Sequence, residues 1–203
     1  MIDTISVLKD KYNVSHETLS DLSYFHDLLL KWQRRLNLIS PKTINDVWDR
    51  HILDSAQLCS FLPKKPCSIL DVGSGAGLPG VILSILTEHQ IHLVESDQKK
   101  CAFLRTVLSR INSNASVHET RLEEMPTLKA DIITARAFAP LPRLLALTQK
   151  QHHLKLRFLL LKGREVNTEL NNIVSWQKIR VTSQHASITS KDGCILELQF
   201  NDV

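Results

Sequence analysis

A turn with four glycines, directly after a short apolar segment, constrains the fold of this chain most. Residues 69–80 read I-L-D-V-G-S-G-A-G-L-P-G, and the apolar residues that follow recur at helical spacing. The pattern predicts a buried parallel strand, a glycine turn and a helix. Such a turn places backbone N–H groups and the positive end of a helix beside the carboxyl end of the strand, where a ligand can approach the main chain. It therefore predicts a nucleotide pocket.

The glycines fit two nucleotide patterns. Residues 75–80 match the G-x-G-x-x-G pattern of dinucleotide enzymes, whereas residues 71–77 match the D-x-G-x-G-x-G pattern of S-adenosylmethionine enzymes. The second is favoured because an adenosine with a methionine tail has no pyrophosphate, and Pro79 lacks an N–H that a pyrophosphate could use. A turn that binds no ligand is disfavoured by the conformational cost of the glycines.

Predicted strands and helices alternate through the rest of the chain. The further predicted parallel strands cover residues 91–95, 115–119, 131–135 and 156–161. The later helices are predicted at residues 97–111, 141–154 and 166–175. Period-2 alternation at residues 179–182 and 194–200 predicts a terminal antiparallel hairpin. We therefore predict an α/β fold, a doubly wound and mostly parallel seven-stranded sheet of the Rossmann-like, class I S-adenosylmethionine methyltransferase type.

The first 62 residues predict a helical cap. Ser15 is placed to cap a long helix, whose apolar face runs from Leu19 to Leu36, and a second helical stretch is predicted at residues 44–62. Residues 63–66 contain two prolines and are too few for a flexible linker. We expect residues 1–62 to pack as a cap on a core of residues 63–203.

Composition limits the classes of function. The chain has 203 residues, of which 43% are hydrophobic, so its length and composition suit one domain with a modest extension. Its net charge of +4 permits an anionic partner without requiring one. The four cysteines lack C-x-x-C spacing, and neither a signal-like N terminus nor a bilayer-spanning run is present. We expect a cytoplasmic protein with no membrane contact. No H-x-x-x-H pattern falls on a plausible helix, so we expect no metal site.

Polar residues after three predicted strands indicate where a ligand would lie. Glu95 ends the second strand, where an acid accepts hydrogen bonds from both ribose hydroxyls of an adenosine. Residues 121–124 follow the third strand and can reach the adenine edge, although a charged loop is an equally good interpretation. Arg136 follows the fourth strand, where a guanidinium can bind a carboxylate or a phosphate bidentately.

Further motifs give the sequence a specific resemblance. In chain order they are N-L-I-S at 37–40, R-H-I-L-D-S at 50–55, the glycine turn at 70–80, E-S at 95–96, K-K at 99–100, R-L-E-E at 121–124, R-A-F-A at 136–139 and K-G at 162–163. With these motifs the sequence resembles the bacterial ribosomal RNA small subunit methyltransferase G family, also called glucose-inhibited division protein B. The resemblance covers nearly the whole chain, and R-H-I-L-D-S and R-A-F-A are its most discriminating elements.

The resemblance implies a cofactor, a substrate and a site. The cofactor is S-adenosylmethionine, and the substrate is N7 of guanine 527 in the 530 loop of 16S ribosomal RNA, as naked RNA, in the small subunit or in an assembly intermediate. The family's cofactor positions correspond to Gly73, Leu78, Leu122, Glu123 and Arg136 in this sequence. With Glu95, which the strand pattern indicates, they make up the predicted cofactor site. Leu78 is commonly phenylalanine in this pattern, and leucine keeps an apolar wall. We expect a monomer.

The chemistry of N7 predicts no catalytic side chain. Guanine N7 has an in-plane lone pair and no proton, so methyl transfer needs no general base, and positioning in line supplies the rate. The target must be unpaired or turned out of its stack.

Two other classes of function stay open. One is a nicotinamide-dependent oxidoreductase that uses the other glycine pattern and Glu95, and the other is a noncatalytic RNA-binding module.

Basic residues are spread over the cap and the strand ends. They are Lys31, Arg34, Arg35, Arg50, Lys99, Lys100, Arg105, Arg136 and Lys162. If the cap covers the carboxyl edge of the sheet, many of them border one opening and can contact RNA phosphates. For the helical ones the alternative is a solvated helix face.

Overall fold

The computed structural model describes residues 4–173 and 179–200, and within them it contains a seven-stranded sheet of order β3-β2-β1-β4-β5-β7-β6. The strands are β1 Ser68–Val72, β2 Gln90–Glu95, β3 Ala115–Glu119, β4 Ile132–Arg136, β5 Arg157–Lys162, β6 Ile179–Ala186 and β7 Cys194–Phe200. The first five are parallel, and β7 is antiparallel to both of its neighbours. The predicted fold class is confirmed.

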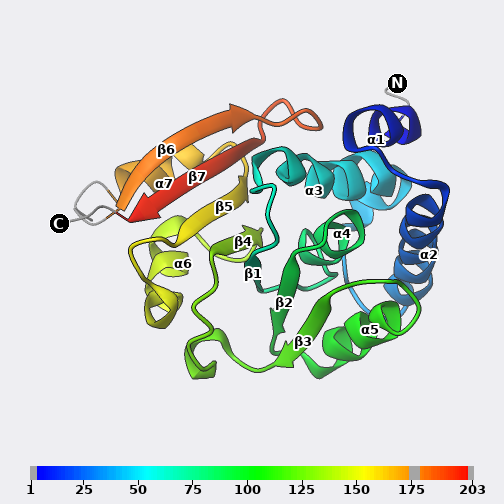
Figure 1. Ribbon diagram of the computed structural model, residues 1–203, viewed down its shortest axis with the longest axis horizontal. Coiled ribbons are helices and arrows are strands. Elements are labelled where there is room, and N and C mark those ends of the chain that lie inside the picture. The colour runs from blue at the N-terminus through cyan, green and yellow to red at the C-terminus, as the bar shows by residue number, and fades with distance from the viewer. Residues whose placement is uncertain (1–3, 174–178, 201–203) are drawn as a thin grey trace.

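Helices cover both faces of the sheet (Figure 1). One face carries α2 His16–Gln33, α4 Gly80–Leu86 and α5 Gln98–Leu108; the other carries α6 Leu141–Leu147 and α7 Val166–Asn171. Alternate residues of each strand serve the two layers, since Ile69 packs toward α4 and Leu70 toward α6. This double burial explains why Ile69, Leu70 and Val72 of β1 are all apolar although successive residues point to opposite faces.

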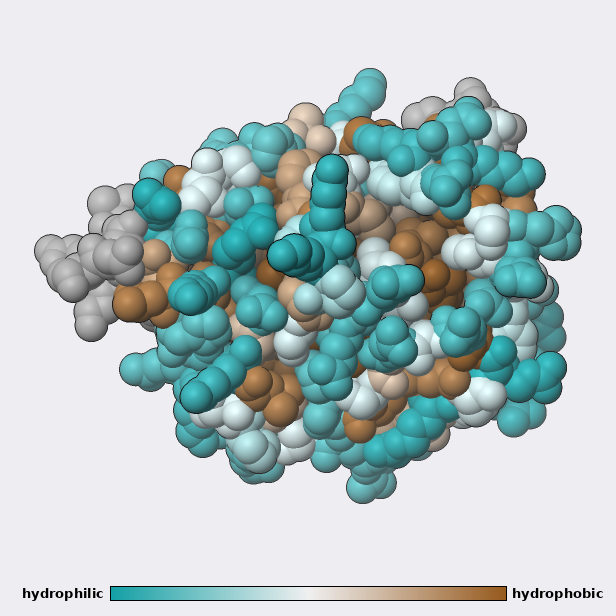
Figure 2. All heavy atoms as spheres, viewed as in Figure 1, coloured by the Kyte–Doolittle hydropathy of each residue, from teal (hydrophilic) through white to brown (hydrophobic). Residues whose placement is uncertain are grey.

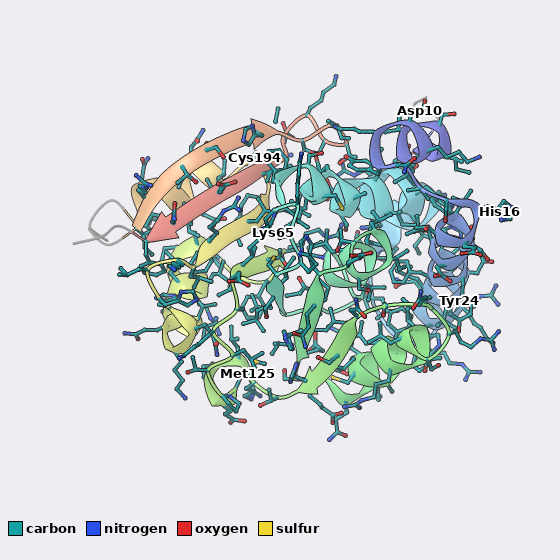
Figure 3. The ribbon with its side chains drawn as sticks, viewed as in Figure 1. Asp10, His16, Tyr24, Lys65, Met125 and Cys194 are labelled. Carbon is teal, nitrogen blue, oxygen red and sulfur yellow. The ribbon has the colours of Figure 1, made fainter. Side chains whose placement is uncertain are left out.

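The cap shares a hydrophobic core with the sheet. Phe103 of α5 contacts two aromatic side chains of α2, Phe25 at 6.4 Å and Trp32 at 5.6 Å between ring centroids. In Figure 3, His16 and Tyr24 mark α2 along the edge of the molecule, and Lys65 marks the connection into β1. The division into a cap and a core at residues 62 and 63 stays a prediction.

The N-terminal helices differ partly from expectation. Ser15 caps α2 as predicted, since its Oγ accepts the Thr18 N–H at 3.1 Å. An additional helix, α1 Thr4–Tyr12, was not predicted. The predicted second helix is wrong as one element, because the chain forms η1 Pro41–Asp46, the π-helix η2 Trp48–Leu53, α3 Asp54–Ala56 and η3 Gln57–Phe61. These departures from α geometry coincide with hydrogen bonds from this stretch to distant parts of the chain.

Three later helices end before their predicted boundaries. α5 stops at Leu108, and α6 stops at Leu147, where Thr148 Oγ1 bonds back to the carbonyl of Leu144 at 2.9 Å; η5 Gln149–Gln151 follows. α7 ends at Asn171, and residues 174–175 of its prediction lie outside the described residues. The hairpin forms as predicted, with β6 longer than expected. A short 3-10 turn, η4 Leu122–Glu124, follows β3.

The described part of the chain contains no helix that could span a membrane. None of its helices combines the length and the apolar character that a bilayer crossing requires. On the face shown in Figure 2, hydrophobic atoms appear in separate groups between hydrophilic ones.

Candidate active site

A pocket of about 430 Å³ lies at the carboxyl ends of β1, β2, β3 and β4. The segments after these four strands form its wall, as expected for a doubly wound sheet. The structure brings all the predicted cofactor residues to this pocket, namely Gly73, Leu78, Glu95, Leu122, Glu123 and Arg136. Leu78 and Leu122 are buried apolar walls, whereas Glu123 is exposed.

The glycine turn forms one side of the pocket in a backbone conformation that favours glycine. Gly73, Gly75 and Gly77 have φ values of 65°, 55° and 82°. The Ser74 N–H donates to the carbonyl of Val94 at 3.0 Å, which ties the turn to β2. The turn is therefore fixed in place before any ligand arrives.

Glu95 holds the glycine turn as well as facing the pocket. Its Oε2 accepts the Gly75 N–H at 2.9 Å, and its Oε1 accepts the N–H groups of Ser96 and Asp97, each at 2.8 Å. A carboxylate offers about four acceptor positions, so these bonds leave about one for a ligand hydroxyl. A second ligand hydroxyl would have to replace one of the backbone donors.

Gly73 and Gly75 differ in what surrounds them. A Cβ on Gly75 would meet only the carbonyl oxygen of Gly73, at 3.7 Å, so the space beside it is open to a ligand. A Cβ on Gly73 would lie 2.0 Å from the Phe138 ring. Alanine at Gly75 would therefore occupy space that a ligand can use, whereas alanine at Gly73 would meet a side chain that already fills the space.

Asp71 is a buried acid directly below the turn. Thr134 Oγ1 donates to its Oδ1 at 3.0 Å. Burial raises the pKa of Asp71 to about 6, although the hydrogen bond from Thr134 and the charge of Arg136 oppose the rise. Its Oδ2 has no hydrogen-bond partner within the described residues. Asp71 was recognised in the sequence only as part of the glycine pattern, and its role here is to connect the end of β1 with β4.

Arg136 reaches from the end of β4 to the cap. Its Nη1 donates to the carbonyl of Arg50 at 3.2 Å and lies 3.6 Å from Asp54 Oδ2. Burial lowers the pKa of Arg136 below its usual value, and the charge of Asp54 opposes this effect. The guanidinium is therefore fixed by two groups of the R-H-I-L-D-S motif while it lines the pocket.

Asp54 joins the cap to the C-terminal hairpin. Its Oδ1 accepts from Thr189 Oγ1 at 2.6 Å, from Gln57 Nε2 at 2.8 Å and from Ser187 Oγ at 3.3 Å. Gln57 also accepts the Ile188 N–H at 3.1 Å. Sequence reasoning quoted Asp54 only within a motif and missed this function, because its partners lie far along the chain. The only signal for this role in the sequence was the carboxylate of Asp54 within the R-H-I-L-D-S motif.

His51, the neighbour of Arg50, is a buried neutral imidazole. The Thr43 hydroxyl donates to the carbonyl of Ser40, so at 2.8 Å it must accept from His51 Nε2, which therefore carries the ring proton. Burial, aided by the charges of Arg136 and Arg50, lowers the pKa of His51 to about 3. Its Nδ1 has no hydrogen-bond partner within residues 4–173 and 179–200.

The basic residues differ in their surroundings. Lys100 and Arg136 line the pocket, whereas a neighbouring hollow is lined by Lys31, Arg34, Arg35 and Lys99. Arg105 pairs with Glu119 and Lys162 with Glu169, each at 2.6 Å. Arg50 donates to the carbonyl of Thr189. We predicted that many of these residues border one opening; six of the nine line the pocket or the neighbouring hollow, and the charges of Arg105 and Lys162 are used in ion pairs.

The pocket can hold a nucleoside with an amino-acid tail through backbone and side-chain contacts. An acid, an exposed glycine backbone and a buried arginine supply acceptors, donors and a positive charge. Across the described ranges, no group of three or more histidine, cysteine or acidic side chains is arranged to hold a metal ion.

Comparisons with known proteins show the family of this chain. The family model of rRNA small subunit methyltransferase G matches residues 18–193. Ribosomal RNA small subunit methyltransferase G of Paramagnetospirillum magneticum is 42% identical over 193 residues, which cover 95% of this chain and 93% of that protein. The protein of the same name from Rhodospirillum rubrum is 42% identical and covers 91% and 92%.

Solved structures share the fold at much lower sequence identity. Magnesium protoporphyrin IX methyltransferase from Synechocystis PCC 6803 has a TM-score of 0.62 at 14% identity, covering 92% of this chain and 98% of that one. A methyltransferase from Aquifex aeolicus has a TM-score of 0.59 at 15% identity, covering 80% and 100%. The folds agree with the family match, and this chain belongs to the ribosomal RNA small subunit methyltransferase G family.

Proposed function

We propose that this protein transfers a methyl group from S-adenosylmethionine to N7 of guanine 527 in the 530 loop of 16S ribosomal RNA. The observation that carries the proposal is the pocket at the strand ends, in which the glycine turn, Glu95 and Arg136 face one space. The family match supports RNA as the substrate. The choice of N7 and of position 527 rests on the sequence resemblance. We further propose that the enzyme acts as a cytoplasmic monomer.

The residues of the pocket suit distinct parts of the cofactor. Glu95 would accept a ribose hydroxyl while keeping its bonds to the turn, and Gly75 leaves room for close approach of the ligand. Leu122 and Glu123 would border the adenine, and Arg136 would bind the methionine carboxylate. When bound, S-adenosylmethionine supplies an electrophilic methyl group on its sulfonium sulfur.

The protein would act on the guanine by position alone. Guanine N7 has a lone pair in the ring plane and no proton to lose, so no side chain has to remove one. Holding the two reactants in line, shielded from water, is a proximity effect that can contribute several kcal/mol. Arg136 is suited to this task because Asp54 and the Arg50 carbonyl restrict its movement.

A methyl-transfer assay tests the proposal. Purified protein is incubated with tritiated S-adenosylmethionine and either small ribosomal subunits that lack the modification or naked 16S ribosomal RNA. Borohydride reduction and aniline cleavage then locate 7-methylguanine. We expect cleavage at position 527, and no cleavage in RNA with adenine at that position. Label at another atom, or none in either substrate, would refute the proposal.

Cofactor binding separates the two alternative classes. Isothermal titration should show binding of S-adenosylhomocysteine and none of NAD. Binding of NAD alone would favour an oxidoreductase that uses Gly75, Gly77 and Gly80. RNA binding without any cofactor binding would favour a noncatalytic module.

A further inference from the structure

A second hollow, of about 450 Å³, lies between the end of α2 and the start of α5. It is lined by Lys31, Trp32, Arg34, Arg35, Leu36, Lys99 and Ala102. Four of these seven residues are cationic and none is acidic. We refer to this set as the basic hollow.

The cations of the basic hollow are not used inside the protein. Within the described residues, Lys31, Arg34, Arg35 and Lys99 form no ion pair. Asp97, the acid nearest to Lys99 in sequence, uses its Oδ1 to accept the Lys99 and Lys100 N–H groups at the start of α5. Arg105, two turns further along α5, pairs instead with Glu119. Like charges gathered without acids repel one another, and an anionic partner relieves that repulsion.

The floor of the basic hollow is apolar and contains an indole. Trp32 is half-buried, and its ring is held by an edge contact with Phe103 at 5.6 Å. Leu36 and Ala102 complete the apolar lining. An aromatic ring with cations around it suits an unpaired nucleotide, because the base stacks on the ring while its phosphate meets the cations.

The basic hollow and the active-site pocket are lined by neighbouring residues of the same two chain segments. Leu36 lines the hollow and Leu38 the pocket, and on the other side Lys99 lines the hollow and Lys100 the pocket. Two separate chain segments therefore border both spaces. A ligand that occupies both spaces has to be an extended polymer, and a single strand of RNA is one.

We propose that the basic hollow binds the unpaired nucleotide next to the target guanine. This inference rests on the proposed function, since it takes the substrate to be single-stranded RNA at the active site. The base contacts Trp32, and its phosphates contact Arg34, Arg35 and Lys99. The enzyme thus holds two consecutive nucleotides, and only the guanine receives the methyl group.

The test compares two double variants of equal charge. The first is Arg34→Gln with Arg35→Gln. The matched control is Lys64→Gln with Lys65→Gln, exposed residues in the connection that enters the amino end of β1. Fluorescence anisotropy measures binding of a labelled RNA hairpin with the 530-loop sequence as a function of salt concentration. S-adenosylhomocysteine affinity and thermal unfolding are measured in parallel.

The expected result is specific to the basic hollow. The arginine variant should bind the hairpin roughly tenfold or more weakly, with its slope against log salt reduced by about 0.7 for each lost phosphate contact. The lysine control should bind like the wild type, and cofactor affinity should stay unchanged in both variants. Equal RNA affinity and slope in all three proteins would overturn the inference and leave the hollow as a site for another class of partner.

A second measurement tests the base contact. RNA hairpins with an abasic residue on the 5′ or the 3′ side of the guanine should bind the wild type more weakly on one side only. A Trp32→Leu variant should lose this difference while keeping its S-adenosylhomocysteine affinity. No difference between the two hairpins would refute base binding. Methyl transfer by the wild type is assayed separately, so failure of the proposed function is distinguishable from failure of this inference.

Discussion

The partly buried ion pair between Arg136 and Asp54 should couple the cap to the active site strongly. The two side chains are 18% and 16% exposed, and the charged atoms lie 3.6 Å apart. At that distance, with an effective dielectric constant of about 20, Coulomb's law gives an attraction of about 5 kcal/mol. Desolvation offsets part of it, so we expect a coupling free energy of about 2–3 kcal/mol.

A double-mutant cycle measures this coupling. Asp54→Asn keeps an oxygen for Thr189 and Ser187 while removing the charge, and Arg136→Met removes the guanidinium while keeping much of the volume. The free energy of unfolding of the wild type, both single variants and the double variant is obtained from urea titrations. Asp54→Asn alone should also weaken S-adenosylhomocysteine binding, because Arg136 loses its fixed position.

The exposed pair of Arg164 and Asp192 is the matched control. Its atoms are closer, at 3.3 Å, but the side chains are 76% and 62% exposed. A cycle with Arg164→Met and Asp192→Asn should give a coupling of about 0.5 kcal/mol or less. The reasoning is refuted if the Arg136–Asp54 coupling is as small as that of the control.

Three further predictions concern the floor of the pocket. Gly75→Ala should lose S-adenosylhomocysteine affinity by calorimetry and lower the melting temperature moderately, because alanine is strained at a φ of 55° although the space beside it is open. Gly73→Ala should lower the melting temperature more, because its φ is also positive and its Cβ meets Phe138. The opposite order would contradict the assignment of open space. Glu95→Gln should weaken S-adenosylhomocysteine binding by about 1–3 kcal/mol, because the charged acceptor of the Gly75 N–H and of a ribose hydroxyl is lost. An unchanged dissociation constant would exclude the ribose contact. The pKa of Asp71 is about 6 in the folded state and about 4 in the unfolded state, so the folded protein binds more protons between pH 4 and 6. The free energy of unfolding of the wild type should therefore rise relative to that of Asp71→Asn as the pH falls from 6 to 4. Parallel curves of stability against pH for the two proteins would refute this.

The sheet could be predicted because its strands carry local signals. Three of the five residues of β1 and four of the six residues of β5 are apolar, and Glu95 and Arg136 are the last residues of their strands. Because the ends of parallel strands meet at one edge, knowing these strands was enough to place the pocket residues together. Here the local sequence determines the geometry.

The cap and its contacts could not be predicted in the same way. Apolar spacing between residues 44 and 62 is compatible with one α-helix, and the tertiary hydrogen bonds of this stretch to Arg136 and Thr189 have no local sequence signal. Likewise, nothing local in the sequence shows that Phe138 fills the space beside Gly73. Both features depend on residues that meet only after the chain has folded.

The bonds of Asp54 to Ser187 and Thr189 also impose an order on biosynthesis. The ribosome releases Asp54 and Arg136 well before it has made the loop between β6 and β7, so a growing chain can build the glycine turn while the carboxylate that restrains Arg136 still lacks these two hydroxyl partners. The last strands to emerge therefore complete a site whose other parts are already in place. A nascent chain that stops short of this loop would keep Asp54 beside Arg136 but would lack the two hydroxyl groups that hold the Asp54 carboxylate.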